Sequence, residues 1–112
     1  MPNMFYGCSL LSSLSIENFD INNAKSMSGM FGGYSELETL DVSHFKTQKV
    51  KDMPKIFQYY SSLKEIDVSH FDTKSVKDMS GMLYFCKNLL FLDILNYDNQ
   101  NVVDMSIMFK DC

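Results

Sequence analysis

Apolar and polar positions along the chain recur with a period of 26 residues. Two apolar columns show it most clearly: Met27, Met53, Met79 and Met105, and Leu11, Leu37, Leu63 and Leu89. The period runs from Met4 to Cys112 without insertion or deletion. A fixed period of this length is typical of stacked arrays, in which each unit buries its apolar face against its neighbours. We therefore predict a single array of about four repeats over residues 1–112.

One half of each repeat carries apolar residues at helical spacing. Met79, Met82, Leu83 and Cys86 stand at i, i+3, i+4 and i+7, the stripe of one helical face. An aspartate stands one residue ahead of three such stripes, where it suits a helix N-cap: Asp52, Asp78 and Asp104. Gly32-Gly33 follows the first stripe and suits a helix stop. We predict a helix of about two turns in each repeat.

The other half of each repeat alternates apolar and polar residues. Ile66 and Val68 alternate with Asp67 and Ser69, the period of a strand with one buried face. Equivalent strands of successive repeats should stack in parallel, about 4.8 Å apart. The predicted fold class is an α/β repeat, a solenoid with parallel strands on one face and short helices on the other.

The sequence of one repeat resembles two known kinds of repeat. The spacing Leu63-x-x-Ile66-x-Val68 is that of leucine-rich repeats. Residues 61–89, SSLKEIDVSHFDTKSVKDMSGMLYFCKNL, resemble the BspA-like leucine-rich-repeat surface proteins, whose units read roughly L-x-x-L-D-V-S-x-F-D-T-x-x-V-x-D-M-S-x-M-F-x-x-C. The first repeat departs from this pattern, with Ser15 and Ser26 in two aspartate positions. The resemblance implies a leucine-rich-repeat-like solenoid, a cell-surface or extracellular location, and adhesion to host or extracellular matrix proteins.

Composition argues against several classes of function. The net charge is −4 and the ten lysines are scattered, so nucleic acid is not an expected partner. No apolar run reaches the roughly 20 residues of a membrane span, and the first ten residues lack the features of a signal peptide. The chain starts and stops in mid-repeat, which suggests a piece of a longer array without caps. Open ends of this kind favour end-to-end self-association.

The residues that most often carry chemistry fall into packing columns. Cys8, Cys86 and Cys112 share a column with two tyrosines, which favours buried thiols; a disulfide between Cys86 and Cys112 is the alternative. Eight of the nine methionines occupy two apolar columns, so we expect packing rather than metal ligation. His44 and His70 share a column without a third repeating ligand and are expected to be solvated. The sequence predicts no catalytic residue, no metal and no cofactor.

The outward row of carboxylates is the remaining candidate. Asp41, Asp67 and Asp93 stand at equivalent positions, where stacked like charges repel. Three readings stay open: hydrogen bonds to nearby hydroxyl or amide groups, a cation or basic-ligand site, or plain solvated repulsion. A catalytic pair needs unequal environments, and a repeating column gives equal ones.

We predict a non-enzymatic protein-binding or adhesion module that binds through the exposed strand face. A passive structural spacer within a larger surface protein is the alternative. Phe91 and Leu95 interrupt the polar pattern and are either an apolar anchor or the cover of an absent neighbour. The candidate ligand-binding residues are Asp41, Ser43, Asp67, Ser69, Phe91, Asp93 and Leu95.

Overall fold

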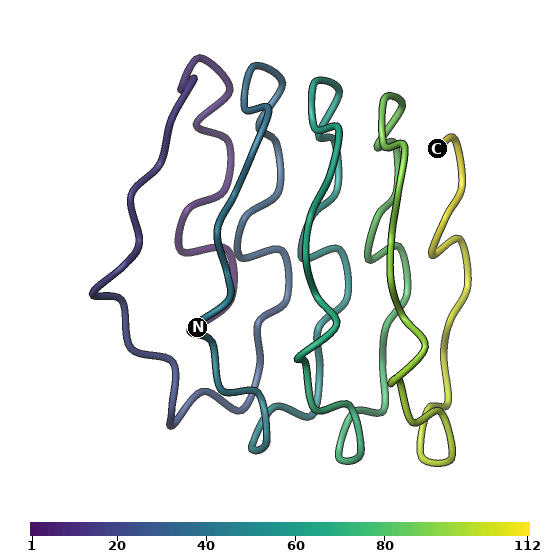
Figure 1. Cartoon of the computed structure of the whole chain (residues 1–112). Helices are drawn as coiled ribbons and strands as arrows, with labels where there is room; N and C mark the ends of the chain where they lie inside the picture. The colour runs from purple at the N-terminus through teal and green to yellow at the C-terminus, as the bar shows by residue number, and fades with distance from the viewer.

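Each repeat forms one irregular coil of chain, and successive coils lie side by side. A computed structural model describes all 112 residues, and the coils follow one another from the N-terminal to the C-terminal end (Figure 1). They enclose one apolar core of 26 buried residues. The whole is a compact globule of 35 × 31 × 21 Å.

The predicted α/β solenoid is wrong, because the chain forms no helix and almost no strand. None of the 40 backbone–backbone hydrogen bonds lies within a helix or a strand. The pairing between coils that resembles a sheet is confined to four isolated parallel bridges: Ser26–Asp52, Asp52–Asp78, Asp78–Asp104 and Glu65–Phe91. The local elements are therefore turns and single bridges, with no helix or strand bounds to assign.

The helices fail to form because a left-handed residue interrupts each predicted one. Gly29, Lys55, Gly81 and Ile107 have φ of 58°, 57°, 58° and 51° at equivalent positions of successive repeats. A right-handed helix requires negative φ throughout, so one such residue ends it. Gly33 has φ 90° and belongs to a second left-handed column, four residues further on, which begins at Gly7 with φ 83°. It therefore serves a turn, and the prediction that Gly32-Gly33 stops a helix is wrong.

Backbone groups that a helix would pair internally pair with the next coil instead. The Gly81 N–H donates to the Ser106 carbonyl at 2.9 Å, and the Leu83 N–H donates to the Met108 carbonyl at 3.0 Å. Between them, the Met82 N–H donates back to Met79 within the same coil. Every second N–H thus crosses to the carbonyl 25 residues ahead. Since isolated two-turn helices are marginal in water, this ladder is the better use of the backbone.

The aspartates predicted to cap helices occupy this region in another role. Asp78 and Asp104 each accept a hydrogen bond from the N–H two residues ahead, at 2.9 and 2.8 Å. This is the local bond of an aspartate turn. The same two residues pair with each other across coils. The N-cap prediction is wrong in its element, because the side chains stabilise turns between bridges.

The inward positions are those that the periodicity indicates. Met79, Met82, Leu83 and Cys86 are fully buried. Equivalent aromatic residues stack from coil to coil, with the ring centroids of Tyr34 and Tyr60 5.5 Å apart. The apolar spacing therefore located the core of the interior coils correctly, although it assigned the wrong local element, and Met105 and Phe109 of the last stripe are exposed.

Candidate functional site

The segments predicted as strands lie side by side on one face but do not form a sheet. Along residues 39–43, 65–69 and 91–95, a single bridge joins neighbours, between Glu65 and Phe91. The N–H groups of Asp41, Asp67 and Asp93 donate no hydrogen bond. The strand prediction is therefore wrong here, and this face is held by side-chain bonds and by the core beneath it.

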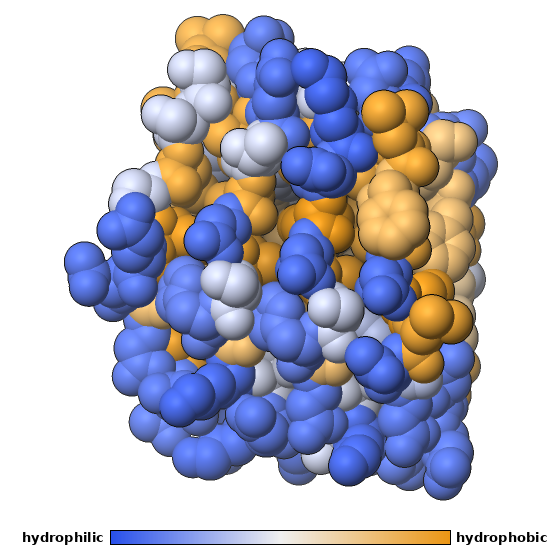
Figure 2. Space-filling view, viewed as in Figure 1, coloured by the Kyte–Doolittle hydropathy of each residue, from blue (hydrophilic) through white to orange (hydrophobic).

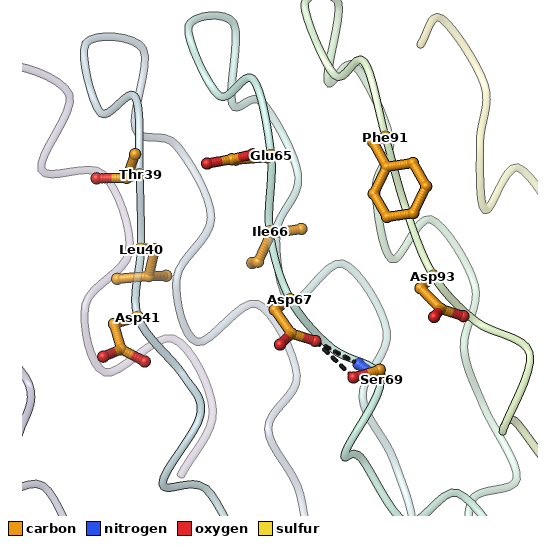
Figure 3. Close-up of a pocket in the computed structure, with 9 residues that line it drawn as sticks. All are labelled: Thr39, Leu40, Asp41, Glu65, Ile66, Asp67, Ser69, Phe91 and Asp93. Atoms are coloured by element: carbon orange, nitrogen blue, oxygen red, sulfur yellow. Dashed lines mark hydrogen bonds between the residues drawn. The ribbon is translucent and has the colours of Figure 1, made fainter.

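A groove of about 520 Å³ crosses this face and spans three successive coils (Figure 3). Its floor includes the side chains of Leu40 and Ile66, which are 6% and 4% exposed. Polar side chains stand on either side of that floor. The lining residues are Thr39, Leu40, Asp41, Glu65, Ile66, Asp67, Ser69, Phe91 and Asp93.

Five of the seven residues predicted to bind a ligand line this groove: Asp41, Asp67, Ser69, Phe91 and Asp93. Ser43 lies outside it and donates its N–H to Asp41 at 2.9 Å. Leu95 lines a smaller adjoining hollow together with Phe91. The floor residues Leu40 and Ile66 were missed as site residues, because inward apolar positions are ordinarily core.

The carboxylates of the outward row are held by short local hydrogen bonds. The N–H groups of Ser43, Ser69 and Leu95 donate to Asp41, Asp67 and Asp93, at 2.9, 3.0 and 3.0 Å. The Ser69 hydroxyl also donates to Asp67, at 2.7 Å. Of the three readings, the hydrogen-bonded one is confirmed. The bonds all reach the same oxygen, Oδ1, of each aspartate.

These bonds favour the ionised carboxylates. The side-chain and backbone hydrogen bonds of Ser43 lower the pKa of Asp41. The hydroxyl and N–H of Ser69 lower the pKa of Asp67 in the same way. Both aspartates therefore carry full negative charge near neutral pH.

Apolar side chains stand exposed at the end of the groove nearest the last coil. Phe91 is 69% exposed, Leu95 is 92% exposed and Leu90 is 83% exposed. Figure 2 shows apolar surface collected at this end, while polar side chains dominate the rest of the same face. Large apolar residues grouped in this way mark contact surfaces more often than scattered ones do.

The cysteines divide according to their coil. Cys86 is buried, and its thiol donates to the Phe57 carbonyl at 3.1 Å. Burial raises the pKa of this thiol to about 12, so it is an unreactive packing group. Cys8 and Cys112 are exposed, so the buried-thiol prediction is wrong for them, because only one neighbouring coil covers each. All three are free thiols.

The other candidates have structural surroundings. Met27, Met30, Met53, Met79 and Met82 are fully buried in the core, which confirms packing for these five. His70 is not simply solvated, since its Nε2 lies 2.8 Å from the Val42 carbonyl. No group of three or more histidine, cysteine or carboxylate side chains is placed to hold a metal ion. The structure contains no helix that could span a membrane.

A match to a protein family covers the whole chain. The family described as "Mycoplasma protein of unknown function, DUF285" matches residues 1–112. No curated protein and no solved structure matches the chain. The family description names no activity, so the match shows which family the chain belongs to but does not assign a function. The chain belongs, over its whole length, to the DUF285 family of Mycoplasma proteins of unknown function.

Proposed function

We propose that the chain is a non-enzymatic protein-binding or adhesion module of a cell-surface protein, and that it binds through the groove. The observation that carries this proposal is the groove itself, which crosses three coils and ends at the exposed ring of Phe91. A surface built from three repeats suits a ligand longer than a small molecule. It is also open along one side, as a site for a polypeptide needs to be.

The chemistry of the groove favours a protein ligand. Binding energy at protein interfaces concentrates in a few large side chains surrounded by polar contacts. Phe91 supplies such an aromatic side chain, and the Leu40 and Ile66 floor supplies apolar surface beside it. Asp41 and Asp67 supply the polar rim.

Location and ligand class come from resemblance. Residues 61–89 resemble the repeats of BspA-like surface proteins, which are associated with adhesion to host cells and matrix proteins. That likeness supports a place at the cell surface and a host or extracellular matrix protein as partner.

Binding to immobilised extracellular matrix proteins, measured by surface plasmon resonance, tests the proposal. We expect saturable binding to at least one of them, and a loss of about tenfold in affinity in Phe91→Ser, which is about 1.4 kcal/mol. Leu10→Ser is the matched control, because Leu10 is an exposed apolar residue, 87% exposed, that does not line the groove. Absence of saturable binding, or equal losses in both variants, would contradict the proposal.

A passive spacer is the second candidate, and one observation favours it. The bonds of Asp41, Asp67 and Asp93 hold the same local turn in each repeat, as a purely structural feature would. If the chain is only a spacer, Phe91→Ser changes the solubility of the protein and does not change its binding to any matrix protein. The same measurement therefore separates the two functions.

A further inference from the structure

We propose that the groove accepts an extended, basic segment of a partner protein, with lysine or arginine side chains over its carboxylates and an apolar side chain against Phe91. This inference rests on the proposed function and specifies the partner. The evidence is the shape of the groove, the charge of its lining and the unused hydrogen-bonding capacity of its carboxylates.

The shape fits a chain laid across the coils. Lining residues come from three successive repeats, with Leu40 and Ile66 below and polar side chains on both sides (Figure 3). A segment lying across them places apolar stems on the floor and charged ends at the rim. Lysine and arginine side chains have this composition, since their methylene stems are apolar.

The charge of the lining selects a basic occupant. Asp41, Glu65, Asp67 and Asp93 contribute four carboxylates, and no lysine, arginine or histidine lines the groove. The neighbouring Lys64 ammonium is already paired with Glu38 at 2.9 Å. A basic segment meets four carboxylates in the groove lining, whereas an acidic one meets repulsion. His44 and His70, which lie outside the lining, also act electrostatically on Asp41, and His70 acts on Asp67.

The carboxylates retain free acceptors. Asp41, Asp67 and Asp93 receive their local hydrogen bonds on Oδ1, so Oδ2 of each remains available. The Glu65 carboxylate accepts no hydrogen bond. Hydrogen bonds from a cationic donor to such oxygens are stronger than neutral ones. The aspartates are thus fixed in position by their turns and still able to bind.

The apolar end of the groove sets where the apolar side chain of the segment lies. Phe91 and Leu95 are exposed apolar residues of the last full repeat. The equivalent positions one repeat earlier are polar, Glu65 and Ser69. The apolar residue of the partner therefore lies at one end of its basic stretch. A segment of alternating basic residues without that residue should bind more weakly.

Calorimetric titration with synthetic peptides tests this inference. The probe is an eight-residue acetylated peptide in which lysine alternates with threonine and two leucines close one end. A second peptide has glutamate at each lysine position. We expect saturable binding of the lysine peptide alone, weakened about threefold or more when sodium chloride rises from 50 to 300 mM, because salt screens exposed charges.

Two variants locate the site on the protein. Glu65→Gln removes a charge without removing a hydrogen bond, and Asp67→Asn keeps an oxygen that the Ser69 N–H can use. Each should weaken the lysine peptide about threefold, an effect typical of losing one exposed ion pair. Asp111→Asn is the matched control, since it removes the same charge outside the groove and should change nothing.

Several results overturn the inference. These are no binding of the lysine peptide, equal binding of the glutamate peptide, or full binding in Glu65→Gln. Stronger competition by calcium chloride than by sodium chloride of equal ionic strength would assign the groove to a divalent cation and also overturn it. If these results coincide with matrix-protein binding that requires Phe91, the proposed function stands and only the basic segment falls.

Discussion

At the residue scale, the coils are joined by side chains that bond to the backbone of the next repeat. The Thr73 hydroxyl donates to the Asp98 carbonyl at 3.2 Å and accepts from the Asp98 N–H at 2.8 Å. Thr47 makes the same pair of bonds to Asp72. Both threonines are 1% exposed, so their hydroxyls are polar groups of the core that are fully used.

Thr73→Val should therefore destabilise the protein by about 1–3 kcal/mol, because it leaves both Asp98 backbone groups without a partner. Sterically the change is mild, since Ile21 occupies the equivalent buried position of the first repeat. Urea denaturation measures the free energy of unfolding. A variant as stable as the wild type would show that the hydroxyl bonds add nothing.

The aspartate turns make a prediction about pH. Because bonds from Ser69 lower the pKa of Asp67 in the folded state, ionised Asp67 stabilises the fold. That stabilisation is complete above the unfolded pKa of about 3.9 and is lost as pH falls through the folded pKa. Asp67→Asn should be less stable than the wild type at pH 6, and the gap should shrink between pH 4 and pH 2. Denaturation at each pH measures it, and a constant gap would refute the account.

At this scale, the sequence predicted correctly which residues of the interior coils are buried, because hydrophobic periodicity determines burial. It did not predict the roles of residues that bond to a neighbouring coil. The inward column of Met79, Met82 and Leu83 follows from spacing alone. The role of Thr73 does not follow from the spacing, because its hydrogen bonds connect residues 25 apart. A threonine in a polar stretch of sequence is ordinarily interpreted as a turn residue. The groove's polar rim was found from the outward row, and its floor of Leu40 and Ile66 was not.

At the scale of the element, one apolar spacing is compatible with two backbones. Residues at i, i+3, i+4 and i+7 face one side of a helix, and the same residues face the core of these coils. The backbone conformation of the intervening residues determines which of the two structures forms. Hydrophobic periodicity does not reveal the left-handed residues Gly29, Lys55 and Gly81. The same left-handed column also includes Asn3 and Ile107, and glycine at two of its five positions was the available signal, because glycine adopts positive φ readily.

Gly81→Ala distinguishes the two backbones by the sign of its effect. In a helix interior, glycine to alanine stabilises by about 1 kcal/mol. Here Gly81 has φ 58°, and an added Cβ would lie 3.2 Å from the Lys55 side chain. We expect a loss of about 1–2 kcal/mol, the cost of a left-handed alanine. Thermal or urea unfolding gives the sign, and a stabilised variant would restore the helix.

At the scale of the whole molecule, the ladder leaves one open face at the first coil and another at the last coil. The N–H groups of Met105, Ile107 and Phe109 donate no hydrogen bond, and their side chains are 40%, 47% and 44% exposed. In the first coil, the carbonyls of Pro2, Met4 and Tyr6 accept none. The two faces are complementary, since each interior coil donates to such carbonyls of the coil ahead.

We therefore expect this polypeptide to self-associate as its concentration rises, each copy setting its last coil on the first coil of another. Sedimentation velocity from 5 to 500 µM measures it. Ile107→Lys should reduce the association, because it places a charge on the open face. A wild-type chain that stays monomeric over this range would contradict the expectation.

The groove depends on the coils being joined by hydrogen bonds 25 residues apart, and scalar couplings across hydrogen bonds in labelled protein test this most directly. We predict a coupling from the Leu83 amide nitrogen to the Met108 carbonyl carbon, and one from Phe57 to Met82, since these N–H groups donate across coils at 3.0 Å. A coupling from Leu83 to Met79, the bond of an α-helix, would contradict the account.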